Sequence, residues 1–167
     1  MALIPLSALN QMDQAEFTQT LGDIFEHTPA IAQQAWLQRP FETVEALHQA
    51  MVAVMQALPI SAQLRLIQAH PDLGAKAKMT DSSVQEQASA GLNQLSPEEF
   101  ATFSELNQAY RDRFQFPFIV AVKEHTKTSI LAAFRQRLTH DSETERQTAL
   151  MEIAKIANYR LTALVQD

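Results

Sequence analysis

The chain has 167 residues, no cysteine and a formal net charge of −6, from 13 basic and 19 acidic side chains. The lack of cysteine excludes disulfides, thiolate nucleophiles and cysteine-based metal sites. The absence of a basic run argues against nucleic acid as a partner. A chain of this length can bury a core that needs neither a metal nor a disulfide to fold.

The sequence also argues against a membrane protein and against a metal site. No apolar stretch approaches the ~18 residues of a membrane span, and the first residues lack the basic start and apolar core of a signal peptide. We therefore expect a cytoplasmic protein. The histidines are scattered without the i, i+4 spacing of a helical zinc site, so no metal is expected; they are His27, His48, His70, His125 and His140.

The first half of the chain reads as helices separated by prolines. Capping residues mark where helices begin, and a residue before proline disfavours the helical region. The pattern predicts a helix from the capping box Asp13/Glu16 to Thr28, a short helix over 30–37, a long helix from Phe41 to Pro59, and a helix capped by Ser61 that ends at His70-Pro71.

The second half is also predicted to be helical, after a polar loop over 71–82. Phe114, Phe116 and Phe118 alternate along the chain, which alone would suggest a strand, but Pro117 favours an extended linker into another helix. The predicted helices begin at Ser83, at Ser96-Pro97, at Thr128, and at a capping box formed by Ser142 and Glu145. The fold expected over 1–167 is all-α, a single compact domain of about seven to eight helices.

His70 and Glu86 are the candidate proton-transfer groups, because an imidazole and a carboxylate suffice for acid–base chemistry near neutral pH. Each also has a simpler interpretation. His70 can be a helix C-terminal cap, and Glu86 can complete a capping box with Ser83. Asp72 is assigned a structural role, as the ion-pair partner of Lys76 or Lys78.

Three further features could bind a polar ligand. Ser83 and Gln87 lie near a helix N-terminus, where free N–H groups favour anions. The segment 116–120 is either core or a source of unpaired backbone N–H groups for a heterocycle. Arg160 either forms a surface ion pair or clamps a carboxylate with its planar donors. Glu26-His27 and Arg39-Pro40-Phe41 are interpreted as packing and hydrogen bonding between helices.

These residues together resemble the 2-oxo-4-hydroxy-4-carboxy-5-ureidoimidazoline (OHCU) decarboxylase family of urate degradation. The resemblance covers most of the chain and rests on the order and spacing of several motifs. They are Phe25-Glu26-His27-Thr28-Pro29, Arg39-Pro40-Phe41, His70-Pro71-Asp72-Leu73, Ser83-x-x-Glu86-Gln87, Ala90-Gly91-Leu92, Leu106-Asn107-x-x-Tyr110, Phe114-x-Phe116-Pro117-Phe118-Ile119 and Ile156-Ala157-x-x-Arg160-Leu161. The sequence departs from the family pattern at Ala30, where we expect Trp, and at Glu124, where we expect Gly.

The resemblance implies an all-α, cofactor-free homodimeric enzyme that converts OHCU to (S)-allantoin and carbon dioxide. His70 is the implied catalytic residue, and Glu86 is assigned with it. The implied substrate contacts are Pro71, Ser83, Val84, Gln85, Glu86, Gln87, the backbone of Phe118, Ile119, Val120, Ala121 and Val122, and Arg160. Two alternatives stay open: a non-enzymatic helical module that binds a partner, and a different cofactor-free lyase or hydrolase acting on a related ureido heterocycle.

Overall fold

The computed structural model describes residues 2–75 and 79–167. Its regular elements within those residues are nine α-helices, two short 3-10 turns and one pair of two-residue strands, so the all-α prediction is confirmed. Contacts divide the chain into two compact units, Met1–Leu66 with Ala154–Asp167, and Ile67–Ile153. Helix α9, Ser142–Leu164, contributes to both. The single-domain organisation stays a prediction.

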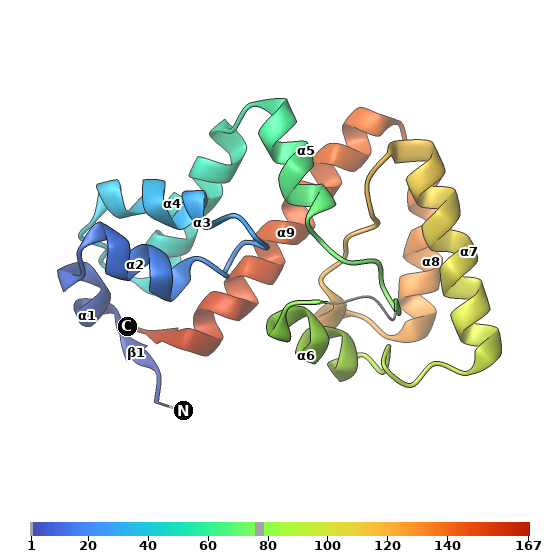
Figure 1. Ribbon diagram of the computed structural model, residues 1–167, viewed down its shortest axis with the longest axis horizontal. Helices are drawn as coiled ribbons and strands as arrows, with labels where there is room; N and C mark the ends of the chain where they lie inside the picture. Colours follow the sequence, from blue (N-terminus) through green and yellow to red (C-terminus); the bar gives the residue numbers. More distant parts are fainter. Residues whose placement is uncertain (1, 76–78) are drawn as a thin grey trace. The chain divides into compact units, whose positions relative to one another are not determined.

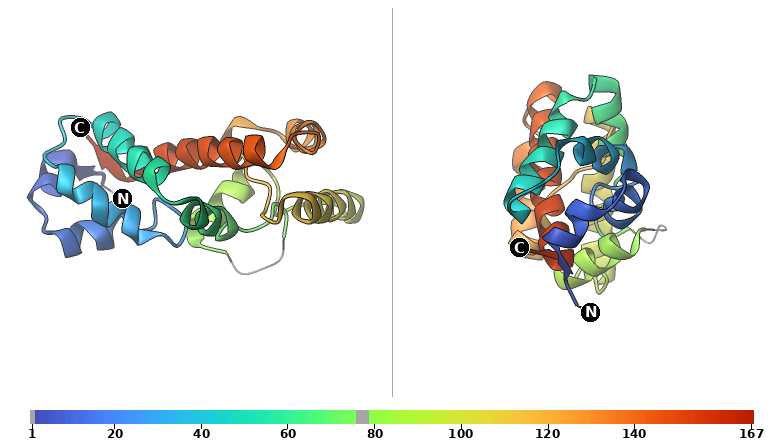
Figure 2. Two further views of the ribbon diagram at one scale, coloured as in Figure 1. Left: turned by 90° about the horizontal axis from the view of Figure 1, so that it is seen from above. Right: turned by 90° about the vertical axis from the view of Figure 1, so that its left-hand side faces the viewer.

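The first unit contains helices α1 to α4, most of α5 and the end of α9 (Figure 1). Its strands β1 and β2 pair in parallel, so the two ends of the chain lie together there. Helix α3 contacts both α2 and α4 (Figure 2). The elements are β1 Ile4–Pro5, α1 Leu6–Gln11, α2 Gln14–Leu21, α3 Pro29–Ala35, η1 Trp36–Gln38, α4 Val44–Ala57, α5 Ile60–Gln68 (which crosses the boundary) and β2 Val165–Gln166.

The capping box predicted at the start of α2 is confirmed, but the predicted end of that helix is wrong. Asp13 Oδ1 accepts the Glu16 N–H at 2.8 Å, and Glu16 Oε2 accepts the Asp13 N–H at 3.1 Å. The helix ends at Leu21 rather than Thr28 because Gly22 occupies the C-cap. A Cβ there would lie 2.5 Å from the Thr18 carbonyl oxygen, so this close turn requires glycine.

The next two predicted helices are confirmed as α3, with its 3-10 extension η1, and α4. The predicted cap of α5 is wrong. That helix begins at Ile60, and the Pro59 carbonyl accepts the N–H groups of Ala62 and Gln63, so Ser61 lies inside the helix. The side chains that form the core of this unit are almost fully buried: Leu9, Phe17, Leu21, Ile31, Leu47, Met51, Met55, Ala157 and Leu161.

The second unit contains α6 Asp81–Ser89, α7 Pro97–Phe114, the 3-10 turn η2 Val122–Glu124, α8 Lys127–Arg137 and the first part of α9. Helix α7 begins with the predicted capping box, in which Ser96 Oγ accepts the Glu99 N–H. Two other predicted caps are wrong. Thr126 rather than Thr128 caps α8, and Asp141 Oδ1 accepts the Thr144 N–H at the start of α9, at 2.7 Å.

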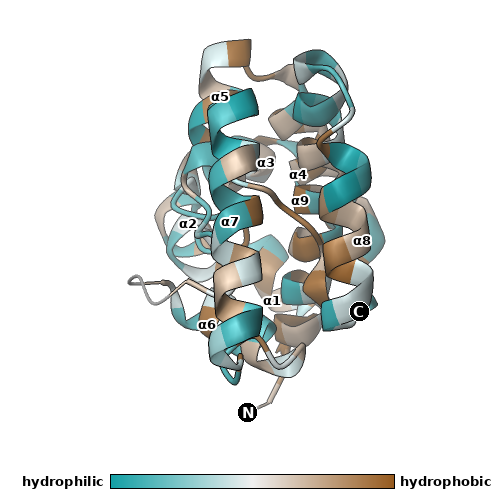
Figure 3. Ribbon diagram, turned by 90° about the vertical axis from the view of Figure 1, so that its right-hand side faces the viewer, coloured by the Kyte–Doolittle hydropathy of each residue, from teal (hydrophilic) through white to brown (hydrophobic). Residues whose placement is uncertain are grey.

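An aromatic cluster forms the core of the second unit and places the extended segment 115–121, as predicted. Phe118 stacks on Phe134 with ring centroids 3.8 Å apart. The Tyr110 ring packs edge-on against Phe118 and Phe116, at 5.3 and 5.9 Å. Figure 3 shows this connection between α7 and α8 coloured as hydrophobic over much of its length. Apolar packing therefore fixes a segment that belongs to no helix or sheet.

No single helix in the described parts of the chain is long and apolar enough to cross a membrane. Helices α4 and α5, which are bent by 115° relative to each other, satisfy the length and composition criteria only as a pair.

Candidate active site

His70 lies directly after α5, at the beginning of the second unit. Its backbone N–H donates to the Ile67 carbonyl at 3.2 Å, which closes the last helical turn. The residue is only 7% exposed. A buried histidine at a helix C-terminus fits a capping role as well as a role in proton transfer, so the catalytic assignment of His70 stays a prediction.

The loop after His70 is tied to α6 by one side chain. Gln87 Oε1 accepts the Gly74 N–H at 2.9 Å, and Gln87 Nε2 donates to the Asp72 carbonyl at 3.3 Å. Gln87 and Gly74 are buried. Gly74 has φ +71°, and a Cβ there would meet the Leu95 side chain at 2.7 Å. Gln87 therefore fixes the conformation of the loop that begins at His70.

Asp72 is confirmed as a structural residue, with a partner that the sequence did not reveal. Asp72 Oδ1 lies 3.0 Å from Arg111 Nε and 2.9 Å from Arg111 Nη2. The two residues therefore form an ion pair in which two guanidinium nitrogens of α7 contact the carboxylate. The partners predicted for it, Lys76 and Lys78, lie outside the described residues. This pair ties the His70 loop to a second helix.

Helix α6 begins two residues earlier than predicted. Thr80 is its N-cap and accepts the Ser83 N–H, so Ser83 is not the cap. The capping-box interpretation of Glu86 is therefore wrong, because Glu86 is the sixth residue of the helix. Ser83 and Gln87 are buried one turn apart, Glu86 is half-buried, and Val84 and Gln85 are exposed. The helix thus turns only part of the predicted contact set toward the protein.

The segment 118–122 is buried over its whole length, and η2 that follows it contacts α6. The structure therefore brings the predicted contact segments 83–87 and 118–122 into the same neighbourhood. The backbone of the segment is held by charged side chains. Arg137 Nη1 donates to the Ile119 carbonyl at 2.6 Å, and the Ala121 N–H donates to Glu152 Oε1 at 3.2 Å.

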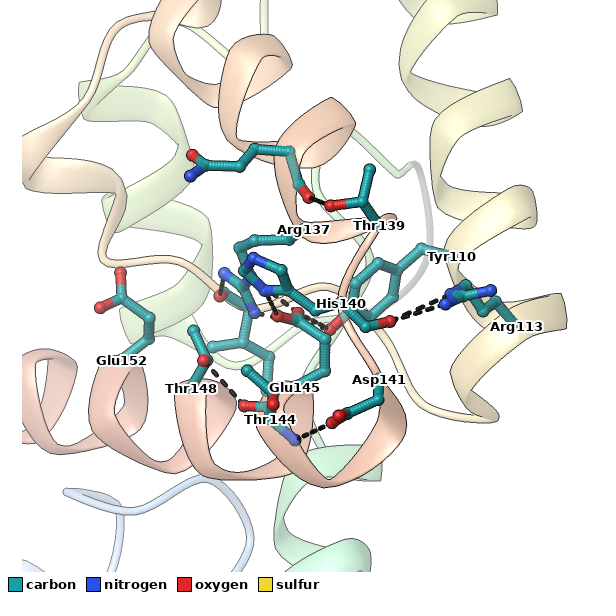
Figure 4. Close-up of polar contacts among 12 residues, drawn as sticks. Tyr110, Arg113, Arg137, Thr139, His140, Asp141, Thr144, Glu145, Thr148 and Glu152 are labelled. Carbon is teal, nitrogen blue, oxygen red and sulfur yellow. Dashed lines mark hydrogen bonds and ion pairs between the residues drawn. The ribbon is translucent and has the colours of Figure 1, made fainter.

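A buried polar cluster beside this segment was missed by the sequence analysis (Figure 4). Glu145 Oε1 accepts from the Tyr110 hydroxyl at 2.5 Å and from Arg137 Nε at 2.8 Å, and His140 Nδ1 lies 2.8 Å from Glu145 Oε2. Burial, and then the hydrogen bond to Glu145, raises the pKa of the Tyr110 hydroxyl well above its usual value. The pattern Ser142-x-x-Glu145 fits a capping box, and that local fit concealed the buried role of Glu145.

Arg160 belongs to the first unit and is buried there rather than paired at the surface. Its Nη2 lies 2.9 Å from Glu26 Oε2, and the two side chains are 7% and 1% exposed. Arg160 Nη1 also donates to the carbonyls of Asp23 and Ile24. The ion pair with Arg160 supports the interpretation of Glu26 as a residue that links elements through its polar contacts. The ion pair of Arg160 is buried, whereas the simpler interpretation of Arg160 expected one at the surface.

The second unit therefore contains two candidate acid–base groups, His70 and Glu86. Within the described residues, no group of three or more His, Asp or Glu side chains is placed to hold a metal ion. The buried imidazole, the helix that carries Glu86 and the buried backbone of 118–122 suit the transfer of a proton to a small polar molecule. A partner-binding module predicts that His70 and Glu86 are either separated in space or buried as caps; the capping box is not formed at Glu86, and the rest of that alternative stays open.

Comparison with known proteins relates the chain to enzymes of urate breakdown. A sequence model described as OHCU decarboxylase matches residues 10–162. A 2-oxo-4-hydroxy-4-carboxy-5-ureidoimidazoline decarboxylase of Halalkalicoccus jeotgali is 43% identical over 98% of this chain and 93% of its own length. The uric acid degradation bifunctional protein PucL of Bacillus subtilis is 45% identical over 99% of this chain, which spans 33% of that protein.

Two solved structures have a similar fold. A crystal structure of (S)-allantoin synthase has a TM-score of 0.79 and 32% identity, over 96% of this chain and 54% of the other. A crystal structure of OHCU decarboxylase in the presence of (S)-allantoin has a TM-score of 0.71 over 91% of this chain and 97% of the other. At 22% identity, the second likeness supports the fold alone.

Proposed function

The chain belongs to the OHCU decarboxylase family, and from this premise we propose that it converts OHCU to (S)-allantoin and carbon dioxide in urate degradation. The relatives named for this reaction align over nearly the whole chain. The observation that carries the proposal is the buried His70 imidazole, in a loop that Gln87 ties to the helix bearing Glu86. We further propose that the enzyme acts as a cytoplasmic homodimer.

The reaction needs a proton and an oriented substrate rather than an electron-sink cofactor. When the bond to the carboxylate breaks, carbon dioxide leaves and the electron pair passes into the adjacent ring system, where the carbonyl and nitrogen atoms can hold it. A proton then reaches the carbon that becomes the stereocentre of allantoin. Delivery from one face yields one enantiomer, which is what a fixed acid on one side of the substrate provides.

We assign His70 to move this proton, and Glu86 to hold the substrate hydroxyl and share in the proton transfer. Pro71, Ser83, Glu86 and the backbone of 118–122 would line the bound heterocycle, and Gln87 would hold the loop beside it. Arg160, whose guanidinium Glu26 holds within the first unit, is assigned to the substrate carboxylate by the family resemblance alone. A general acid of this kind supplies ~10²–10⁴-fold in rate. The proposal needs no metal and no organic cofactor.

The test follows the chirality of the product. OHCU is generated in solution from urate with urate oxidase and hydroxyisourate hydrolase, and circular dichroism records the appearance of allantoin. The expected result is a rapid rise of the S enantiomer with the wild-type protein, lost in His70→Ala and in Glu86→Ala. His48→Gln is the matched control, since His48 is a half-buried histidine whose Nε2 lies 2.8 Å from the Ala154 carbonyl.

Racemic allantoin at the uncatalysed rate with the wild-type protein would overturn the proposed reaction. Rapid stereospecific turnover that survives His70→Ala would keep the reaction and overturn the assignment of His70. Equal loss of activity in His48→Gln would mean that histidine removal damages the protein generally, so the role given to His70 would fall as well.

A further inference from the structure

We propose that Arg137 is a positioning residue that sets the backbone of 118–122 for the substrate, and that Glu145 and Tyr110 fix its guanidinium for this purpose. This inference rests on the proposed function, in which 118–122 lines the bound heterocycle. Arg137 itself acts through the segment. All of these residues belong to the second unit, and the polar contacts among Tyr110, Arg137 and Glu145 are drawn in Figure 4.

Arg137 holds the segment from two sides. Its Nη1 donates to the Ile119 carbonyl at 2.6 Å, and its guanidinium carbon lies 4.3 Å from the centre of the Phe118 ring. One planar group therefore fixes both the carbonyl direction at one residue and the ring of the residue before it. The Arg137 side chain is only 8% exposed, so water does not compete strongly for these contacts.

The guanidinium is itself held in place by a fully buried carboxylate. Glu145 Oε1 accepts from Arg137 Nε at 2.8 Å and from the Tyr110 hydroxyl at 2.5 Å. The other oxygen, Oε2, lies 2.8 Å from His140 Nδ1. Because both carboxylate oxygens are occupied and the Glu145 side chain is 0% exposed, the guanidinium plane has one strongly preferred orientation.

A second buried charge fixes the same segment two residues further on. Glu152 Oε1 accepts the Ala121 N–H at 3.2 Å. A positive side chain thus holds a carbonyl at Ile119 and a negative side chain holds an N–H at Ala121. The segment 115–121 lies in no helix or sheet, so its buried backbone groups need such partners. These two contacts define which way the peptide planes between them face.

Core stability alone gives little reason to bury these charges. Burying an ion pair costs desolvation, and well-packed apolar side chains of similar volume often serve stability equally well. What these buried charges provide is a defined backbone orientation in the segment 118–122. This segment leads into η2, which contacts α6, the helix that carries Glu86. A displacement of about 1 Å in such a support can cost about 100-fold in turnover.

The test compares Arg137→Lys with Ile130→Val. Lysine keeps the charge but lacks the planar fork, so it cannot serve Ile119, Glu145 and Phe118 together. Ile130 is fully buried on the same helix, and Ile130→Val loosens the core without removing a hydrogen bond or a charge, because both side chains are apolar. Steady-state kinetics on OHCU give kcat and KM, and hydrogen exchange read by mass spectrometry follows the peptide that contains 118–122. Both measurements are made well below the melting temperature of each variant.

We expect Arg137→Lys to lose about 100-fold in kcat with faster exchange in the 118–122 peptide, while Ile130→Val keeps the wild-type kcat and exchange. If Arg137→Lys does not fold, Glu145→Gln replaces it in the test. Glutamine keeps the shape of the Glu145 side chain but removes the charge that orients Arg137, so we expect the same loss of kcat and the same faster exchange. Wild-type kcat in the variant that folds, or a loss matched by Ile130→Val, would overturn the positioning role.

The two proposals fail in different ways. Absence of OHCU turnover by the wild-type protein would overturn the proposed function and with it the link to substrate. In that case the exchange data still decide whether Arg137 orders the segment. Normal wild-type turnover with an unaffected Arg137→Lys would overturn the positioning role alone.

Discussion

Arg160 and Glu26 form a buried ion pair, with Nη2 and Oε2 2.9 Å apart and side chains that are 7% and 1% exposed. The Asp23 and Ile24 carbonyls also accept from Arg160 Nη1, although at 3.3 and 3.4 Å. Glu26 therefore sets the plane of the guanidinium that we assign to the substrate carboxylate. Its role is to orient a cation rather than to provide surface charge.

Replacing Glu26 with Gln should destabilise the protein by about 3 kcal/mol, because it leaves a buried arginine without its counter-charge. Urea unfolding measures this loss. Adding Arg160→Met to Glu26→Gln should recover part of it, since the double variant no longer buries an unpaired charge. A loss below about 0.5 kcal/mol in Glu26→Gln would contradict the buried character of the pair.

The caps that the structure assigns give a second prediction. Asp141→Ala should lower the unfolding free energy measurably, because Asp141 Oδ1 accepts the Thr144 N–H at the start of α9. Ser142→Ala, at an exposed neighbouring position, should stay within about 0.5 kcal/mol. If Ser142→Ala destabilised the protein more than Asp141→Ala in thermal or urea unfolding, Ser142 rather than Asp141 would be the cap of α9.

The same cap should make stability depend on acid. The hydrogen bond from the Thr144 backbone N–H lowers the pKa of the Asp141 carboxyl in the folded protein. Its contribution is therefore complete above the unfolded-state pKa of about 4 and is lost below it, as the pH falls through the lowered folded-state pKa. Asp141→Asn keeps a capping oxygen but cannot titrate, so its unfolding free energy should fall less than that of the wild type between pH 5 and pH 3. Parallel pH curves would contradict this.

The fold was predictable where local signals act alone. Proline stops and apolar periodicity located α3, α4 and α7, and the Ser96 capping box was right in detail. Errors arose where two capping residues stand close together, as at Thr126 and Thr128 or at Asp141 and Ser142. Local rules cannot choose between them, because the choice depends on burial. Glu145 goes inward to Tyr110, 35 residues away in sequence, and so cannot cap α9.

The candidate site was located largely through the resemblance, while its supporting contacts were not predictable. His70 and Glu86 stand out as residue types. The partners of Gln87 are backbone groups of Gly74 and Asp72, and no sequence pattern marks a backbone acceptor. The sequence therefore assigned Gln87 to the substrate, whereas its described contacts favour support of the loop.

Gln87→Met should accordingly affect stability and turnover together. It removes both hydrogen bonds and leaves the buried Gly74 N–H without its acceptor, at a cost of about 2 kcal/mol. Since the loop begins at His70, kcat should fall as well. Gln87→Glu keeps an oxygen for the Gly74 N–H but buries a charge and turns its second oxygen toward the Asp72 carbonyl, so its unfolding free energy should fall at least as far. A large change in KM with unchanged stability would instead indicate direct substrate contact.

Tyr110→Phe tests the buried cluster through its dependence on alkaline pH. The hydroxyl donates to Glu145 Oε1 at 2.5 Å, and its removal should cost about 2 kcal/mol near pH 8. Burial, followed by the hydrogen bond to Glu145, raises the pKa of Tyr110 in the folded protein. A raised folded-state pKa means that this contribution is complete below the unfolded-state value of about 10 and is lost as the pH rises above it.

The measurement is the difference in unfolding free energy between wild type and Tyr110→Phe from pH 8 to pH 11.5. That difference should stay constant up to about pH 9.5 and then shrink, because only the wild-type unfolded chain gains the ionised Tyr110. Taking the difference cancels the titrations that both proteins share, including those of lysines. A gap that stays constant to pH 11.5 would mean that Tyr110 ionises equally in both states and does not bind a buried carboxylate.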